Sequence, residues 1–299
     1  MKKKELDALF RVPAGKKIRL KDYDPGWAGT KSLAKLESDE LKEKAKELVR
    51  EDLENLSKAQ EVLYASDTWS VLVIFQAMDA AGKDGMIKHV MSGVNPSGCE
   101  VSSFKKPSDE ELDHNYLWRY ARRMPSRGLI GIFNRSYYEE VLVVRVHPEI
   151  LDVQKLPDGK KGKDIWEERY QDINAFERHL ARNGTLILKF FLHVSKKEQK
   201  KRFLARLDDS AKHWKFSTAD VAERGHWDAY QDAFEDAISA TSTDWAPWYV
   251  VPADHKWISR AVVAEVITKS IENLDLKFPK MTKERMKGLD EARKLLESE

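Results

Sequence analysis

A short loop of small residues ending in Gly-Lys is the first place in the sequence where chemistry is expected. It follows the apolar run Ser70 to Phe75 and precedes a helical pattern that begins at Met86. In a strand–loop–helix of this kind, backbone N–H groups hold phosphate and the lysine neutralises its outer oxygens. We therefore predict a phosphate-binding loop. Its residues are Gln76-Ala77-Met78-Asp79-Ala80-Ala81-Gly82-Lys83-Asp84-Gly85.

The loop departs from the usual phosphate-loop pattern, G-x-x-x-x-G-K-[ST], at both ends. Ala77 stands at the first glycine position, and Asp84 stands where a metal-binding hydroxyl is expected. A simple strand–turn–helix with a chance Gly-Lys is the alternative reading. Asp79 argues against it, because a carboxylate inside an anion-binding loop is stable if it holds Mg²⁺ against the phosphates.

A second group of polar residues follows the run Leu129 to Phe133. In open α/β sheets, ligands bind beyond the carboxyl ends of the strands, so Asn134 and Arg135 are expected to face the phosphate loop. A metal-binding carboxylate is common at this position, but Asn134 is neutral. Glu139, one helical turn later, is the nearest acid that could supply the charge. It is equally compatible with a solvated acid at a helix start.

Basic residues gather in two segments that suit a polyanion. His114 to Arg127 contains four arginines and no acid, and Lys196 to Lys215 holds eight Lys or Arg against three acids, a local charge of +5. A solvated helix face explains most of the second segment. Arg202 and Arg206 differ, because they lie four residues apart on one face and lead toward Lys212 and Lys215. Such a helix and loop, after the fourth strand of a kinase-like sheet, predict a mobile lid.

Alternating apolar runs and helical patterns must position these groups. Apolar residues fill both faces of each run, which is typical of buried parallel strands, and the alternation predicts a doubly wound α/β layer structure. Helical spacing is expected between the runs. The predicted strands are Ser70 to Phe75, Glu100 to Phe104, Leu129 to Phe133, Leu186 to Leu192 and Trp248 to Val251. The predicted helices are 38–64 (one long helix or two short ones), 109–123, 164–182, 196–207, 218–241, 256–275 and 281–298.

Composition limits the class of protein. The 299 residues carry 52 basic and 50 acidic side chains, a net charge of +2, which argues against a nucleic-acid coat protein. The longest purely apolar run, Val71 to Phe75, is far too short to span a bilayer, and the first residues lack an export signal. We expect a cytoplasmic protein that binds neither membrane nor nucleic acid. The single Cys99 excludes an internal disulfide.

No linker rich in Gly, Ser or Pro divides the chain, so we expect one domain over residues 1–299. Within it we expect an irregular N-terminal arm followed by a helix, a lid and a pair of C-terminal helices. Their ranges are 1–65, 196–225 and 256–299.

Several segments together resemble the polyphosphate kinase 2 family, in particular its branch acting on both AMP and ADP. Their order and spacing from residue 70 to residue 255 make coincidence implausible. The matching segments are FQAMDAAGKDG (75–85), VNPSG (94–98), NYLWR (115–119), IFNRSYYEEVLVVRVH (132–147), LILKFFLHVSKKEQKKR (186–202), WKFS (214–217) and TSTDWAPWYVVPA (241–253).

The resemblance implies a three-layer, thymidylate-kinase-like P-loop fold with a five-stranded parallel sheet, helices on both faces and a helical lid. It implies Mg²⁺-dependent transfer of a phosphoryl group between inorganic polyphosphate and purine nucleotides (AMP, ADP, ATP, or GMP and GDP) by a homo-oligomer, a dimer or tetramer. Other branches carry Asp at position 134 and Asn at position 139, which leaves the second metal ligand open.

Roles for the candidate residues follow from the resemblance and from the residues themselves. By position, the resemblance implies that Asp79 holds the metal and Lys83 binds phosphate, and Glu139 is the candidate second metal ligand because it is the nearest acid after Asn134. With Arg135 these residues form the expected catalytic group. The expected substrate-binding residues are Ala80, Ala81, Gly82, Asp84, Gly85, Arg119, Arg122, Asn134, Arg202, Arg206, Lys212 and Lys215.

Two other functions stay open at this point. An ATP-dependent nucleoside monophosphate kinase could use the same fold, but it would be expected to keep the first glycine and the Ser/Thr that Ala77 and Asp84 replace. A non-catalytic polyanion-binding module would explain the basic segments. It would not explain acids at Asp79 and Glu139.

Overall fold

A twisted parallel sheet forms the centre of the computed structural model, which describes residues 8–29, 38–157, 159–162 and 164–299. The strand order is β2-β3-β1-β4-β5, and every neighbouring pair is parallel. All five predicted strands are confirmed. The strands are β1 (Ser70–Gln76), β2 (Cys99–Ser103), β3 (Ile130–Asn134), β4 (Thr185–His193) and β5 (Trp248–Pro252).

The central strands are buried because their side chains are apolar on both faces. Every residue of β1 is buried, and so is every residue of β5. The register places Phe75 of β1 opposite Asn134 of β3 and Phe190 of β4. The chain therefore leaves β1 and β3 at the same edge of the sheet, so the loop after β1 lies beside Arg135.

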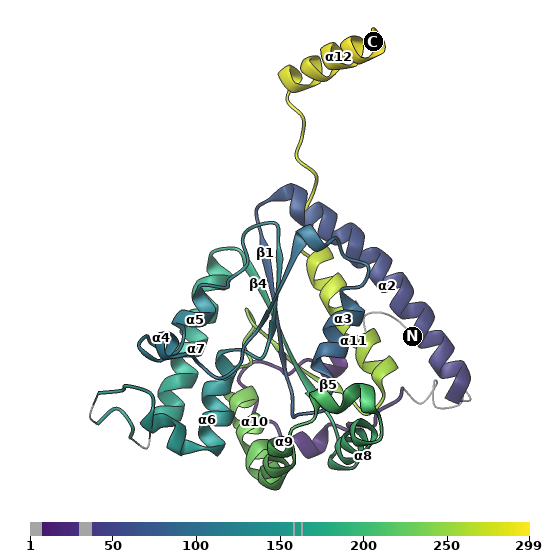
Figure 1. The fold of residues 1–299 in the computed structure, drawn as a ribbon. Helices are drawn as coiled ribbons and strands as arrows, with labels where there is room; N and C mark the ends of the chain where they lie inside the picture. Colours follow the sequence, from purple (N-terminus) through teal and green to yellow (C-terminus); the bar gives the residue numbers. More distant parts are fainter. Residues whose placement is uncertain (1–7, 30–37, 158, 163) are drawn as a thin grey trace.

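Helices cover both faces of the sheet, as expected. Figure 1 shows α2 (Ser38–Ser66), α3 (Lys83–Val90) and α11 (Lys256–Glu272) on one side, and α5 (Trp118–Ala121), α6 (Val143–Val146), α7 (Ile165–Arg182) and α10 (Trp227–Thr241) on the other. Near the carboxyl ends of the strands lie α8 (Lys196–Leu207) and α9 (Thr218–Glu223). Short 3₁₀ turns at η3 (Tyr137–Val141), η5 (Ser210–Lys215) and η6 (Arg224–His226) connect these elements.

Two of the predicted helices are wrong in extent. The segment 109–123 forms two separate single turns, α4 (Asp109–Leu112) and α5, because the Asn115 side chain accepts the Leu117 N–H at 3.1 Å and closes a local turn. The segment 218–241 is interrupted by η6, which contains Gly225. This interruption allows α9 to lie over the carboxyl edge of the sheet while α10 packs against α6 and α7.

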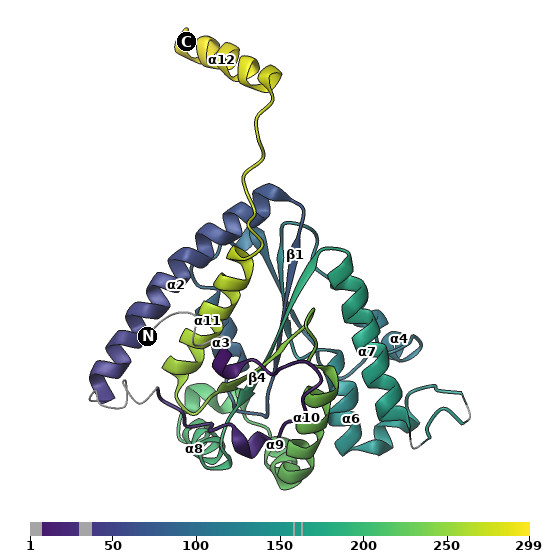
Figure 2. The same cartoon turned by 180° about the vertical axis from the view of Figure 1, so that it is seen from behind.

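The N-terminal arm extends the sheet on its β5 side. Arg11 forms an antiparallel bridge with Tyr249, and the Val12 N–H donates to the Trp248 carbonyl at 2.8 Å. Val12 is buried. Residues 8–29 thus pair with the edge strand and contribute buried side chains, and Figure 2 shows the arm beside β4 and β5.

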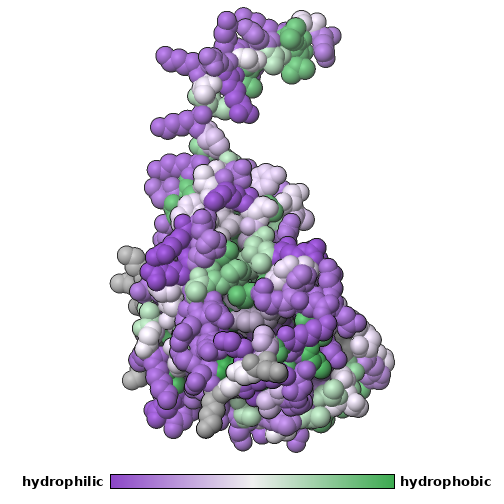
Figure 3. Space-filling view, turned by 90° about the vertical axis from the view of Figure 1, so that its left-hand side faces the viewer, coloured by the Kyte–Doolittle hydropathy of each residue, from purple (hydrophilic) through white to green (hydrophobic). Residues whose placement is uncertain are grey.

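The last helix, α12 (Lys283–Glu297), stands clear of the body at the end opposite the carboxyl edge of the strands (Figure 1). None of its residues is buried. Figure 3 shows it as a separate lobe above a mostly hydrophilic surface. Within the described part of the chain, no helix has the length and apolar character needed to cross a membrane.

Candidate active site

The loop between β1 and α3 has the backbone shape of an anion-binding concavity. Ala80 has φ +59° and Gly82 has φ +107°, so left-handed residues alternate with others just before the N-terminus of α3. Such alternation turns successive N–H groups toward one point. A side chain at residue 82 would be strained at this φ, and its Cβ would lie 3.8 Å from the Arg202 guanidinium.

Lys83 bends back over the loop it follows. Its Nζ donates to the Ala77 carbonyl at 2.9 Å. Burial and the nearby Arg135 guanidinium lower the pKa of the Lys83 ammonium, and Asp79, Glu139 and Asp84 oppose that shift. A phosphate entering the loop would add negative charge beside this ammonium, which favours its protonated form.

Arg135 joins the two predicted metal-binding acids. Its guanidinium lies 3.2 Å from Asp79 Oδ1 and 3.4 Å from Glu139 Oε2. Glu139 and Asp79 raise the pKa of Arg135, with Glu139 the largest cause, although burial opposes the shift. Arg135 has φ +65°, a strained conformation for a residue with a side chain. The structure therefore brings all four predicted catalytic residues together, and strained backbone is typical of functional sites.

The oxygen atoms around Arg135 suit a hard cation. Mg²⁺ is commonly bound by one or two carboxylates, with phosphate oxygens and water completing the octahedron. Asp79 and Glu139 supply two carboxylates, and Asn134 Nδ2 donates to Asp84 Oδ1 at 2.8 Å beside them. Among the described residues no three His, Cys, Asp or Glu side chains form a complete cage. The donor set fits a metal that arrives with phosphate.

A cavity of about 960 Å³ opens above the loop, and cationic side chains surround it. They come from elements far apart in the sequence: the loop, the ends of β2 and β3, α8, η5 and the start of α11. The cations that line it are Lys83, Lys105, Lys106, Arg135, Arg202, Arg206, Lys212 and Lys256. Asp79, Ala80, Gly82, Asp84, Gly85 and Asn134 also line it. This collection of charges can bind a ligand with several phosphates.

A smaller cavity of about 210 Å³ adjoins the first, and Asp79, Arg135 and Asp220 line both. Burial and the nearby Asp79 raise the pKa of Asp220. Its carboxylate lies 3.8 Å from Arg206, which lines the larger cavity.

Several predicted substrate-binding residues have other partners. Arg202 donates its N–H groups to backbone carbonyls, although it lines the cavity. Arg119 is buried, lies 3.3 Å from Glu111 and donates to the Lys105 carbonyl. Neither Arg119 nor Arg122 lines the cavity. Their contact with substrate stays a prediction.

Arg122 is an exposed arginine whose guanidinium lies over the Trp118 ring. At η5, Lys212 pairs with Asp209 at 2.6 Å. The side chain of Lys215 lies outside the described residues.

Sequence reasoning missed several residues that the structure places at the site, among them Lys105, Lys106, Gln199 and Asp220. The two lysines follow the carboxyl end of β2, so the rule that identified Arg135 after β3 could have found them. Gln199 donates to the Asp79 carbonyl, and Asp220 lies on α9. No local pattern marks either, because both reach the site only through tertiary packing.

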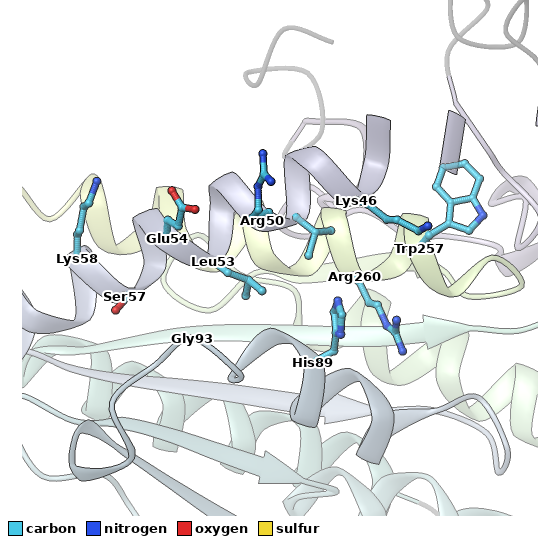
Figure 4. A pocket seen from close by; sticks show the side chains of 11 residues that line it. Lys46, Arg50, Leu53, Glu54, Ser57, Lys58, His89, Gly93, Trp257 and Arg260 are labelled. Atoms are coloured by element: carbon cyan, nitrogen blue, oxygen red, sulfur yellow. The ribbon is translucent and has the colours of Figure 1, made fainter. Parts of the chain in front are cut away.

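A third cavity, of about 700 Å³, lies away from this chemistry between α2, α3 and α11. Figure 4 shows Lys46, Arg50 and Lys58 along α2, with His89 and Arg260 facing them. Leu53 and Trp257 give it an apolar lining. It has no carboxylate pair or phosphate loop, so it is not the candidate active site.

Comparisons with known proteins agree with this geometry. A family model described as Polyphosphate kinase 2 matches residues 37–279. The chain is 53% identical over 292 residues to an ADP-polyphosphate phosphotransferase of Rhodopseudomonas palustris, covering 96% of this chain and 97% of that protein. It is 48% identical over 224 residues to an AMP/ADP-polyphosphate phosphotransferase of Meiothermus ruber, covering 75% and 80%.

The fold is likewise similar to a solved structure. A crystal structure of a polyphosphate kinase 2 from Arthrobacter aurescens superposes with a TM-score of 0.81 at 39% sequence identity, covering 92% of each chain. The similarity therefore extends over most of both chains.

Proposed function

The chain belongs to the polyphosphate kinase 2 family and is a polyphosphate-dependent nucleotide kinase; on that premise we propose that it phosphorylates both AMP and ADP, with Mg²⁺. The relatives' names divide on the nucleotide, one naming ADP and one naming AMP and ADP. This chain carries Asn134 and Glu139 at the two positions whose swap is expected of the branch that uses both.

The observation that carries the proposal is the convergence of cations on one cavity. Lys83 and Arg135 lie at its base, and Arg206 and Lys212 lie on the α8–η5 side. A single nucleotide phosphate group needs few such partners, whereas an acceptor and a polyphosphate chain bound together present many negative oxygens. Fixed positive charges are most useful where charge develops in the transition state.

Direct transfer needs little more from the protein. A terminal phosphate oxygen of the nucleotide attacks the last phosphorus of the polyphosphate, the P–O bond to the next phosphate breaks, and a chain one phosphate shorter leaves. The attacking oxygen is already ionised at neutral pH, so no strong base is needed. Lys83 and Arg135 would stabilise the charge on the transferring group, and no covalent intermediate is required.

Asp79 and Glu139 are the residues that would hold Mg²⁺ in this site. When bound, the ion would neutralise phosphate charge. Arg135 contacts both carboxylates, so its guanidinium would fix their spacing.

The decisive experiment measures ATP formed from ADP, polyphosphate and Mg²⁺, alongside ADP formed from AMP and polyphosphate. Both products are expected, and both should disappear when EDTA removes the metal. A control with ATP plus AMP and no polyphosphate tests the alternative of an ATP-dependent monophosphate kinase. Activity in that control alone would contradict the proposal.

Three further points belong to the proposal. Residues 196–225 would act as the lid of a domain spanning 1–299, closing over the cavity that Arg206 and Lys212 line. We expect a homo-oligomer, a dimer or tetramer, which light scattering coupled to size-exclusion chromatography would detect. The sequence favours a cytoplasmic protein.

A further inference from the structure

Helix α8 runs along the outside of the phosphate loop and contacts three successive carbonyls of it. Gln199 Nε2 donates to the Asp79 carbonyl at 3.0 Å. Arg202, one turn later on the same helix face, donates through NH1 to the Ala80 carbonyl at 3.2 Å and to the Ala81 carbonyl at 2.6 Å. Gln199 is 1% exposed and the Arg202 side chain is 10% exposed, so neither contact competes with bulk water.

These contacts determine where the loop N–H groups point. In a planar trans peptide, the carbonyl of one residue and the N–H of the next point in opposite directions. Holding the carbonyls of Asp79, Ala80 and Ala81 toward α8 therefore turns the N–H groups of the three following residues away from it. The Ala81 N–H donates to Met78 within the loop at 3.3 Å. Among the described residues, no backbone carbonyl accepts from Ala80 or Gly82, so both N–H groups remain for a ligand.

Arg202 also links the loop to the segment that follows β5, an edge strand of the sheet. Its NH2 donates to the Ala253 carbonyl at 2.6 Å and the Asp254 carbonyl at 3.2 Å, just after β5. Its Nε donates to Glu198 at 2.9 Å. All five N–H groups of the guanidinium thus have acceptors within the protein. A residue in this state is poorly suited to bind phosphate, in contrast to Arg206.

Gln199 links the same loop to the segment after α8. Its Oε1 accepts from Arg224 NH1 at 2.7 Å, and that nitrogen also donates to the Lys196 carbonyl at 2.8 Å. Arg224 lies in η6, which follows α9. One amide side chain therefore contacts the phosphate loop through its nitrogen and Arg224, near the C-terminal end of the proposed lid, through its oxygen.

We propose that Gln199 and Arg202, at the start of the proposed lid, are positioning residues that orient the phosphate-loop N–H groups, and that Gln199 couples this orientation to Arg224 near the other end of the lid. The inference rests on the proposed function, because it assigns these residues to the binding of polyphosphate by that site. It replaces the expectation that Arg202 itself grips the chain. It also explains how Ala80 keeps a strained left-handed conformation, since its carbonyl is held from outside.

The test compares four proteins: wild type, Arg202→Lys, Gln199→Met and the control Lys201→Ala. Lys201 is the next residue along α8, and its side chain is 81% exposed, so its removal deletes a charge without touching the loop. Tripolyphosphate affinity is measured by calorimetry at low and physiological salt. Hydrogen exchange of the peptide covering residues 77–86 reports on the loop itself.

Arg202→Lys keeps the charge but cannot hold four carbonyls, so we expect affinity to fall about 10- to 10²-fold, the cost of small misplacements in a preorganised site. Gln199→Met should weaken binding by a smaller factor. Both variants should show faster exchange in the loop and the same salt dependence as wild type. Lys201→Ala should remain within about threefold of wild type, because exposed charges contribute little.

Two outcomes would overturn the inference. If Arg202→Lys binds tripolyphosphate normally with unchanged loop exchange, charge alone is the function of Arg202. If weaker binding comes with weaker salt dependence, the residue contacts phosphate directly. Should Arg202→Lys fail to fold, normal binding and exchange in Gln199→Met would be decisive against positioning. A wild type that forms no ATP from ADP and polyphosphate would contradict the proposed function instead.

Discussion

Lys83 and Lys189 lie among similar side chains, but only Lys83 lines a cavity. Lys189 is 0% exposed and donates to Glu177 at 2.6 Å, to the Thr241 carbonyl at 2.7 Å and to the Tyr138 hydroxyl at 2.9 Å. These acceptors use all three ammonium protons. Among the described residues, the Lys83 side chain has one hydrogen-bond partner, the Ala77 carbonyl, and Lys83 lines the cavity of about 960 Å³ above the loop.

The acids beside the two lysines differ in the same way. Glu177 is buried and accepts from the hydroxyls of Tyr137 and Tyr138, both at 2.9 Å, in addition to Lys189. Asp79 and Glu139 share one guanidinium and keep side chains that are 31% and 20% exposed. We call Lys189 with Glu177 the complete cluster, because its charged groups are satisfied without a ligand. We call Lys83 with Asp79, Arg135 and Glu139 the open cluster, because its carboxylate and ammonium groups can still bind a ligand. Access to a cavity, and not the residue types, separates a structural charge cluster from a candidate active site.

The largest expected effect is on the complete cluster. Replacing Lys189 by Ala leaves Glu177 buried without its cation, so we expect the free energy of unfolding to fall by about 3–5 kcal/mol. Urea denaturation measures it. The double variant Lys189→Met with Glu177→Gln should recover most of the loss, because Gln can still accept from the tyrosines. Equal destabilisation in both variants would mean that packing, not the unpaired charge, dominates.

Next in size are changes to the open cluster. Lys83→Met and Asp79→Asn should each lower turnover at least 10²-fold, the scale expected for one preorganised charge-stabilising group. Their urea midpoints should stay close to wild type, because partial exposure lets water replace the missing partner. Steady-state assays with ADP and polyphosphate provide the measurement. Near-normal turnover in either variant would break the comparison, since the loop would then not be the active site.

A smaller effect is expected at Arg206, which lies 3.8 Å from Asp220 at the edge of the cavity. Arg206→Ala should raise the KM for long polyphosphate several-fold at low salt. The difference from wild type should shrink as salt increases, because exposed charges are screened over ~8–10 Å at physiological ionic strength. An unchanged KM at every salt concentration would mean that Arg206 is a solvated charge on the helix surface and does not bind polyphosphate.

The smallest expected effect concerns Glu139 of the open cluster and tests its role in nucleotide preference. AMP places its acceptor phosphate one phosphate unit deeper than ADP, and a carboxylate at Glu139 could hold a metal or water that bridges this difference. Glu139→Asn should therefore lower AMP phosphorylation more than ADP phosphorylation, with the fold retained because a polar change at a helix start costs at most about 1 kcal/mol. Equal losses would make Glu139 a general metal ligand, and no loss would make it a surface acid.

Local signals were sufficient for much of the fold. The apolar runs that predicted five strands needed no knowledge of their neighbours, because burial on both faces of a parallel sheet appears directly in composition. The single helix predicted over 109–123 was wrong because a specific side-chain contact, which composition does not show, interrupts it. Its helical spacing was real, but the Asn115 side chain closes a turn that periodicity does not detect.

The sequence by itself determined the phosphate loop, the strand ends that carry Arg135, and the family, because each depends on residues close together in the chain. Tertiary structure decided the rest. It separated Arg202, whose N–H groups are used mostly by backbone carbonyls, from Arg206, whose guanidinium lies beside the Asp220 carboxylate. It also brought Gln199 to the Asp79 carbonyl, 120 residues away in sequence. The partners of a long polar side chain depend on which backbone groups lie within its reach in the folded protein. The neighbouring residues in the sequence do not indicate them.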